Sequence, residues 1–236
     1  MKCSRYALIA GILTATLAAV AWGGYAYVGT GDEFAKVLVE FGDGAVFAFG
    51  VSFDDPSTTG IDLMDAIEAG TTLTTQRKYY TGLGYIIEEI SYLGHVSTDA
   101  WSPQNPDAWW RYWVKNPPAA WEMPWDYGAS TRIVSDGCAD AYVYGHSNSP
   151  RLPGDANNDL AVNGGDLALL GGSWMETGKT WADGDFNGDG KVDGGDLALM
   201  GGNWAFGPPP APAPLPEPMA AVLLAIAAAP LLRRRG

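Results

Sequence analysis

One acidic pattern, written twice between residues 154 and 204, limits what this chain can fold into more than any other feature. Asp155 and Asp185 begin the two copies, 30 residues apart, and Trp174 and Trp204 close them at the same separation. Within each copy, Asp or Asn recurs at alternate positions and an Asp stands at position 12. So short a segment, rich in Asp, Asn and Gly, cannot bury a sufficient core unaided. The pattern therefore predicts a structure organised around bound cations.

The spacing of the oxygen-bearing residues is that of a calcium loop. Calcium takes about six to eight oxygen ligands, supplied by loop positions 1, 3, 5, 7, 9 and 12. The two copies therefore predict two calcium ions. The predicted ligands are Asp155, Asn157, Asp159, the Ala161 carbonyl, Asn163 and Asp166 in the first loop, and Asp185, Asn187, Asp189, the Lys191 carbonyl, Asp193 and Asp196 in the second. The sharp turn at position 6 favours glycine, which is present as Gly190 but replaced by Leu160, so we expect the first site to be strained or weaker.

A short apolar stripe follows each loop. Leu167, Leu170 and Trp174 recur in the second copy as leucine, methionine and tryptophan, at spacings of i, i+3 and i+7. This spacing predicts a short helix that a Gly-Gly pair weakens or ends. Because the two copies are in register, we expect two loop-helix units that pair about a pseudo-twofold axis and bury their stripes together.

The duplicated loop-helix of residues 152–207 resembles the type I dockerin domain. The resemblance implies a small all-α module that folds with calcium and docks non-covalently onto a cohesin, typically to hold polysaccharide-degrading enzymes on a scaffold. Dockerins of this family usually recognise their cohesin through the residues at loop positions 10 and 11. In this chain these residues are Gly164-Gly165 and Gly194-Gly195. The resemblance therefore supports calcium binding more directly than it supports cohesin recognition. We expect the partner to be a cohesin-like or other surface protein.

The N-terminus has the layout of a secretory signal peptide. Lys2 and Arg5 precede an apolar run to Trp22, and small residues then recur at positions suited to cleavage. Residues 1–26 are therefore predicted to direct export, with an uncleaved membrane anchor as the alternative. Cleavage would remove Cys3 and leave Cys138 as a lone thiol, which we expect to be buried.

The C-terminus combines a proline-rich linker, residues 208–218, with an apolar segment and an arginine cluster within residues 219–236. This order resembles a PEP-CTERM sorting signal, and its motif residues are Pro216, Glu217, Pro218, Arg233, Arg234 and Arg235. The resemblance implies an exosortase partner and delivery to the cell envelope, outer surface or extracellular matrix of a Gram-negative-type bacterium. The arginines also follow the positive-inside rule, so both termini would meet the membrane before processing. A plain C-terminal membrane anchor is the alternative.

Residues 34–148 predict a separate β-rich domain. Apolar runs at 36–41 and 45–53 flank Gly42-Asp43-Gly44 and predict a hairpin. The spacing in residues 61–67 predicts one helix, and β-rich runs follow at 85–92, 109–114 and 131–144. The fold class is therefore α+β, with one main helix on a mixed or antiparallel sheet. The order of these pieces resembles the transcobalamin C-terminal-like domain, which implies a β-grasp fold.

Tryptophan and tyrosine are concentrated in the middle of this domain. Trp109, Trp110, Tyr112 and Trp113 are candidates for a stacking platform that binds a glycan or another small ligand. Alternation along a strand places Trp110 and Tyr112 on one face and the other two on the opposite face, so core packing is the alternative.

Charge and motif content exclude several functions. A net charge of −13 argues against nucleic acid as a partner. The chain has no nucleophile elbow, zinc motif or phosphate loop, and its adjacent carboxylate pairs, Asp54-Asp55 and Glu88-Glu89, point to opposite faces of a strand. We therefore expect a non-catalytic protein linked to extracellular polysaccharide assemblies. The alternatives are an accessory protein that binds a carbohydrate or small ligand, and a small scaffold-borne hydrolase.

Overall fold

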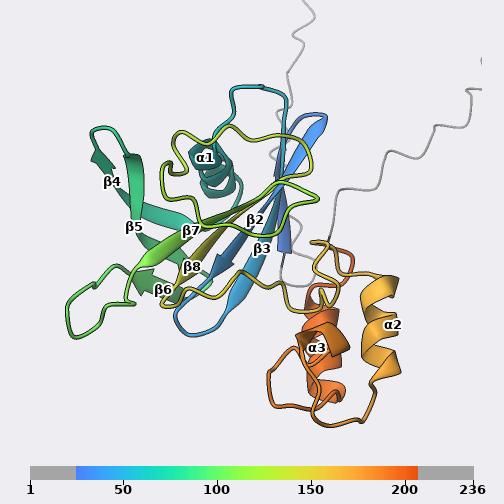
Figure 1. Ribbon diagram of the computed structural model, residues 1–236. Helices are drawn as coiled ribbons and strands as arrows, with labels where there is room; N and C mark the ends of the chain where they lie inside the picture. Colours follow the sequence, from blue (N-terminus) through green and yellow to red (C-terminus); the bar gives the residue numbers. More distant parts are fainter. Residues whose placement is uncertain (1–24, 207–236) are drawn as a thin grey trace, which may run out of the picture.

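A five-stranded mixed sheet lies at the centre of the computed structural model, which describes residues 25–206 (Figure 1). The strand order is β1-β3-β2-β8-β7. These strands are β1 (Tyr25–Gly29), β2 (Glu33–Glu40), β3 (Val46–Phe53), β7 (Trp110–Lys115) and β8 (Ala139–Tyr144). The β2-β3 and β7-β8 pairs are antiparallel, and the β1-β3 and β2-β8 pairs are parallel.

The β2-β3 hairpin confirms the prediction made from its two apolar runs. Val37 lies opposite Phe49, and Gly44 takes a φ of +85° in the turn, where a side chain would be strained. Strand β2 is buried along almost its whole length, since only its two terminal glutamates are partly exposed. A strand buried on both sides needs a covering layer on each face of the sheet.

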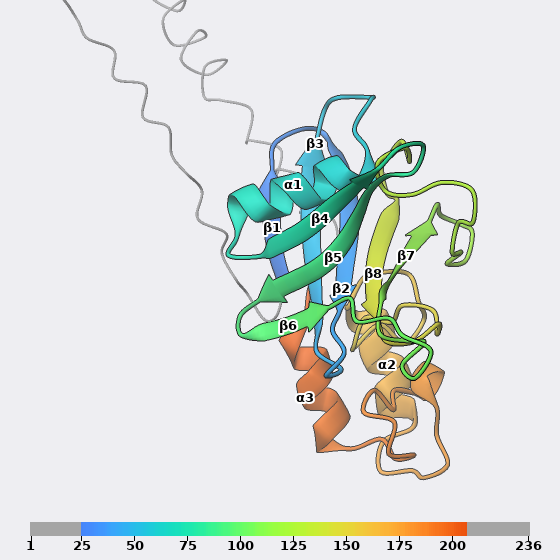
Figure 2. The ribbon, with the colours of Figure 1, turned by 90° about the vertical axis from the view of Figure 1, so that its left-hand side faces the viewer.

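Helix α1 and a second sheet cover the first face (Figure 2). Helix α1 (Gly60–Gly70) begins at Thr59, whose hydroxyl accepts a hydrogen bond from the Asp62 amide in a capping box. Its buried residues include Leu63, Met64 and Ile67, in agreement with the helix predicted at 61–67. Beside it lies a three-stranded antiparallel sheet of β4 (Thr74–Tyr80), β5 (Gly84–Tyr92) and β6 (His95–Thr98).

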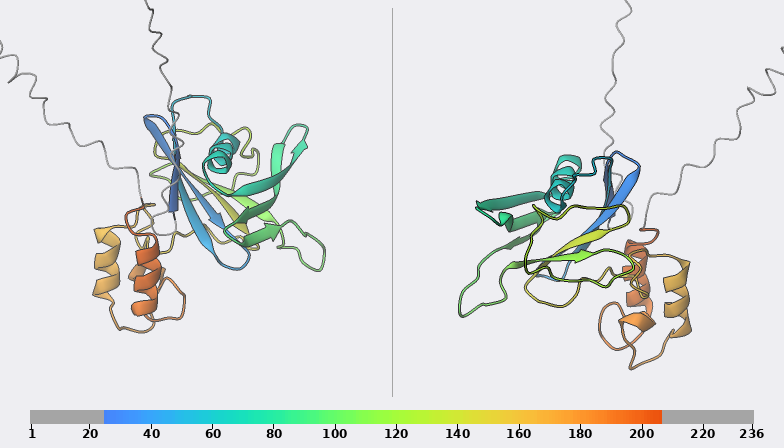
Figure 3. Two further views of the ribbon diagram at one scale, coloured as in Figure 1. Left: turned by 180° about the vertical axis from the view of Figure 1, so that it is seen from behind. Right: turned by 45° about the horizontal axis from the view of Figure 1, so that its top comes forward.

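The C-terminal part of the described chain covers the second face. It consists of α2 (Gly164–Gly172), the short 3-10 helix η1 (Trp181–Asp183), α3 (Gly194–Gly202) and the two acidic loops. Figure 3 shows α2 and α3 side by side at one end of the molecule. A second core cluster joins this module to the sheet, with Leu38, Ala141 and Trp113 on the sheet side and Leu160 and Phe206 on the module side. The module is therefore packed against its own neighbouring domain.

Three details differ from the sequence-based expectations. The run at 131–144 is a strand only from Ala139, because residues 131–138 form the loop that brings Arg132 and Cys138 under the sheet. Strand β1 precedes the stretch at 34–148 and pairs with β3. The apolar stripes are not buried as units: Leu170 and Met200 are buried, whereas Leu167 and Trp174 and their counterparts in the second copy are 41–42 % exposed. The tryptophans lie beyond the ends of the helices, which explains their exposure.

The mixed α+β class is confirmed. Cys138 is free and buried, as expected, and burial raises the pKa of its thiol to about 11. Within residues 25–206 no helix has the length and apolar character needed to cross a bilayer. Of the two segments expected to reach the membrane, 219–236 lies outside the described residues, and so does 1–26 up to residue 24. Tyr25 and Ala26, the last two residues of the expected signal peptide, belong to β1 instead.

Candidate functional site

The last carboxylate of each acidic loop joins the loop to the helix that follows. Asp166 Oδ1 accepts hydrogen bonds from the Ala156 and Asn157 amides at 2.9 and 3.3 Å, and its Oδ2 accepts one from the Asn163 amide at 2.9 Å. Asn163 caps α2 in return, since its side-chain oxygen accepts from the Gly165 amide at 2.8 Å. The side chains at loop positions 9 and 12 therefore close the loop and cap the N-terminus of the helix at the same time.

The second loop repeats this geometry. Asp196 accepts from the Phe186, Asn187 and Asp193 amides at 2.8–3.1 Å, and Asp193 caps α3. The first carboxylates also match: Asp155 Oδ2 accepts from the Leu160 amide at 2.8 Å, and Asp185 Oδ2 accepts from the Gly190 amide at 3.0 Å.

The 30-residue offset extends to the contacts between the two units. The Val162 amide donates to Phe206 O and the Val192 amide to Glu176 O, so each loop bonds the chain that leaves the helix of the other unit. Gly154 and Gly184, each just before a loop, take φ of +103° and +104° and approach the backbone of the other unit's helix. A Cβ at Gly184 would meet Leu170 Cα at 2.8 Å, so only glycine fits there.

The donor set fits calcium. Each loop offers only carboxylate, amide and carbonyl oxygens, the ligands that a hard divalent cation prefers. The first and last carboxylates are buried in both loops: Asp155, Asp166, Asp185 and Asp196 are at most 5 % exposed. Burial, together with the nearby charges of Asp159 and Asp166, raises the pKa of Asp155 to about 6, although the hydrogen bond from the Leu160 amide acts in the opposite direction. A bound divalent cation would offset this desolvation and repulsion.

These carboxylates are engaged with backbone amides in the structure. In residues 25–206 no group of three or more Asp, Glu, His or Cys side chains gathers closely enough to hold a metal ion. The predicted calcium ligands therefore lie along the two loops in the expected order, with their oxygens turned toward amides of the same loop.

Leu160 distinguishes the first loop from the second. It takes a φ of +65° at the position where Gly190 has +82°, and its side chain is 2 % exposed in the core shared with the sheet. Two buried lysines of the sheet reach the same loop: the Lys36 ammonium donates to the Leu160 carbonyl, and the Lys115 ammonium donates to the Asn158 carbonyl at 2.6 Å. Burial lowers the pKa of Lys36 to about 8, although Asp159 and Asp155 act in the opposite direction.

The module also carries exposed apolar side chains that repeat with the 30-residue offset. They are Leu167, Leu169 and Trp174 in the first unit and Leu197, Leu199 and Trp204 in the second, each 38–42 % exposed. The Gly-Gly pairs that begin α2 and α3 are exposed as well. Exposed apolar groups that gather on one module are typical of an interaction surface.

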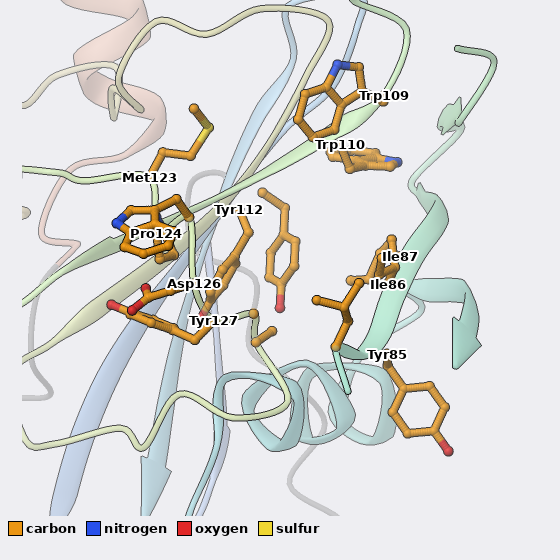
Figure 4. A pocket seen from close by; sticks show the side chains of 15 residues that line it. Tyr85, Ile86, Ile87, Trp109, Trp110, Tyr112, Met123, Pro124, Asp126 and Tyr127 are labelled. Carbon is orange, nitrogen blue, oxygen red and sulfur yellow. The ribbon is translucent and has the colours of Figure 1, made fainter. Parts of the chain in front are cut away.

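A second candidate site is an aromatic pocket in the β domain (Figure 4). It has a volume of about 370 Å³ and lies between β7, β5 and the loop at 123–129. Trp109, Trp110 and Tyr112 line it, whereas Trp113 is 9 % exposed in the core beneath the acidic module. The structure thus brings three of the four candidate aromatic residues together, because Trp109 precedes the strand and does not follow its alternation.

Sequence reasoning missed the loop side of this pocket. Met123, Trp125 and Tyr127 belong to it, and Trp125 is 92 % exposed. Their signal in the sequence was a tryptophan between Pro124 and Asp126, in a segment with no strand periodicity. Beneath the pocket, Tyr112 donates to Asp140 at 2.5 Å, and Arg132 donates to the same carboxylate at 2.6 Å. Burial raises the pKa of Asp140, and the adjacent Arg132 charge counters that effect.

Two oxygen-rich loops, each leading into a short helix and related by a fixed offset, are the features of a paired calcium-loop module. Residues 153–202 match the family model of the dockerin type I domain. The chain therefore contains a type I dockerin domain, a class of docking module that binds calcium and cohesin-type partners. No curated protein and no solved structure shows significant similarity to the chain.

Proposed function

We propose that this chain is an exported, non-catalytic surface protein whose dockerin domain binds two calcium ions and docks onto a cohesin-like partner of a polysaccharide-related assembly. The observation that carries this proposal is the repeated pair of loops, which bury four carboxylates beside equivalent exposed side chains. Buried like charges favour a bound cation, and repeated exposed apolar groups favour a protein partner.

The docking surface has an unusual chemistry at its recognition positions. Gly164-Gly165 and Gly194-Gly195 present backbone only, and the exposed leucines Leu167 and Leu197 lie one turn further along the two helices. A matching partner would present an apolar surface that approaches the backbone closely, with few charged side chains.

Export is proposed from the termini, and the burial of strand β1 favours the earlier of two candidate cleavage positions. Tyr25 and Ala26 are 9 % and 1 % exposed within the sheet, so cleavage after Ala26 would remove two buried residues of β1. Cleavage after Ala21 would keep the strand whole. We also propose sorting by the C-terminal Pro-Glu-Pro and arginine motif and delivery to the envelope, outer surface or matrix.

The β domain has a β-grasp arrangement in this proposal. In support, the strands β3-β2-β8-β7 place a returning strand parallel to the first strand of the hairpin, and α1 follows the hairpin. A second candidate function, binding of a small ligand, belongs to this domain because the aromatic pocket lies in it.

A calcium titration of residues 25–206, followed by isothermal calorimetry and thermal unfolding, tests the main proposal. We expect two bound ions and a rise in Tm of more than about 5 °C, because calcium binds the folded loops in preference to the unfolded chain. Asp185→Ala and Asp155→Ala should each remove one ion, and Asp185→Ala should cost more affinity because the second loop has glycine at position 6. Absence of any calcium heat would refute the proposal.

Partner docking is measured separately. A recombinant cohesin panel immobilised on a sensor surface should capture the calcium-loaded chain and release it in chelator. Capture that is equally strong with and without calcium would contradict docking through the loops. Leu167→Lys and Leu197→Lys should reduce capture, whereas Leu93→Lys, at an exposed leucine of the β domain, is the matched control.

A further inference from the structure

The aromatic pocket has walls from three separate parts of the β domain. Figure 4 shows Tyr112 between the loop residues Asp126 and Tyr127 on one side and Ile86 on the other, with Trp110 above Ile86 in this view. Its floor is buried, since Trp110 is 6 % exposed. Its rim is exposed: Leu83, Tyr85, Ile86, Trp109, Met123 and Trp125 are each at least 36 % exposed. So many large apolar side chains around one opening are costly in water unless a ligand covers them.

The polar atoms of the floor are already engaged. Trp110 Nε1 donates to Ser97 O at 3.1 Å, and the Tyr112 hydroxyl donates to Asp140. The floor therefore presents ring surface to a ligand and few free hydrogen-bonding groups. Arg111 lies 4.4 Å from the centre of the Trp109 ring, so one face of that ring is also occupied.

The charge of the lining selects against several ligand classes. Among the residues that line the pocket there is no Lys, Arg, His, Asn or Gln, and Asp126 is the single charged side chain. An anion would find no cation to pair with, and a sugar would find none of the amide and guanidinium groups that bind hydroxyls in pairs. An aromatic wall with one carboxylate favours a cation, by attraction to ring faces and to the carboxylate.

We propose that this pocket binds a small aromatic amine, with its ring against Trp110 and Tyr112 and its ammonium group at Asp126. The volume of about 370 Å³ is within the range of small-molecule sites and accommodates a single ring with a short side chain. The net charge of −13 also raises the local concentration of cations. This proposal deepens the ligand-binding role given above as the second candidate function.

Three probes of nearly equal shape separate the classes: phenethylamine, 2-phenylethanol and 3-phenylpropanoate. Binding is followed by tryptophan fluorescence of calcium-loaded residues 25–206, under excitation that the phenyl group does not absorb. We expect phenethylamine to bind about three to ten times more tightly than the alcohol, and the carboxylate to bind most weakly. Equal affinity for all three probes, saturation by cellobiose instead, or no response to any of them would overturn the proposal.

Two substitutions locate the site. Asp126→Asn should abolish the preference for the amine over the alcohol. Trp125→Ala should weaken every probe, whereas Trp101→Ala, which removes a 64 % exposed tryptophan outside the lining, should weaken none. The calcium titration is repeated on each variant. Loss of probe binding can then be distinguished from loss of calcium binding by the dockerin domain.

Discussion

Leu160 and Met175 are two residues with the same backbone conformation and opposite surroundings. Leu160 has a φ of +65° and Met175 a φ of +63°, a region that costs a side chain roughly 1 kcal/mol relative to glycine. Leu160 is 2 % exposed and packs in the core below the sheet, whereas Met175 is 72 % exposed. Burial therefore offsets the strained backbone at Leu160, and no comparable gain exists at Met175.

Glycine substitutions at these two residues should have opposite effects. Leu160→Gly should destabilise residues 25–206 by about 2–4 kcal/mol, because the lost core contacts exceed the strain that is relieved. Met175→Gly should be neutral or stabilise by a few tenths of a kcal/mol. Urea unfolding measures the free energy of unfolding of both variants. A larger loss of stability in Met175→Gly than in Leu160→Gly would show that Leu160 is not a packing residue.

The order of the calcium ligands was predictable because it depends on spacing alone within one loop. The surroundings of Leu160 were not, because they depend on a sheet whose strand β2 lies more than 100 residues earlier in the chain. The sequence marked Leu160 as a departure at position 6. Only the packed structure shows that its side chain joins the module to the sheet.

At the level of elements, the two acidic loops are similar in internal bonding and differ in what supports them from outside. Lys36 from β2 and Lys115 from β7 donate to carbonyls of the first loop. In the second loop no sheet side chain within residues 25–206 takes this role: the Gly190 carbonyl accepts from the Gly178 and Lys179 amides of the module itself, and a Cβ at Gly188 or Gly190 would meet nothing within 4 Å. The first loop is thus held by two buried side chains of the sheet, and the second by backbone amides of its own module.

Hydrogen exchange in chelator should reveal this difference. The Leu160 and Gly190 amides both donate to the first carboxylate of their loop, at 2.8 and 3.0 Å, so they form a matched pair. After correction for intrinsic rates, we expect the Leu160 amide to exchange at least about tenfold more slowly. Lys36→Met should reduce the difference between the two exchange rates. Lys179→Met, at a lysine that pairs with Glu176, should leave the difference unchanged. If the Leu160 and Gly190 amides of the parent chain exchanged at equal rates, the claim that the sheet stabilises the first loop would be wrong.

Local elements were predicted well and long-range ones were not. The β2-β3 hairpin and α1 follow from turn residues and helical spacing within about 35 residues of chain. The loop at 131–138 was mistaken for strand because its apolar residue Val134 is buried by distant elements. The exposure of Trp174 and Trp204 was also missed, since the helices end before reaching them.

In the whole molecule, the five-stranded sheet is covered on both faces. Val37 and Phe49 belong to the core on the α1 side, and Leu38 and Ala48 to the core on the module side. Adjacent residues of the same strands therefore stabilise different layers, which makes the dockerin module and the β domain dependent on each other.

Calorimetry of residues 25–206 with calcium should accordingly show one cooperative transition. Phe206→Ala removes a ring that is 1 % exposed and contacts Tyr25 and Tyr27, so it should weaken the junction and split the transition into two. Trp174→Ala, at an exposed ring of the same module, should keep the single transition. Two transitions in the parent chain would show that the layers unfold independently.

The junction at Phe206 also brings the two ends of the described chain together. Tyr25 donates from its hydroxyl to the Trp204 carbonyl at 3.0 Å, and its ring lies 5.4 Å from that of Phe206. Mechanical tension between the segments that precede Tyr25 and follow Phe206 would therefore act first on this one contact. Until the contact separates, the second acidic loop and the aromatic pocket lie outside the path of the force.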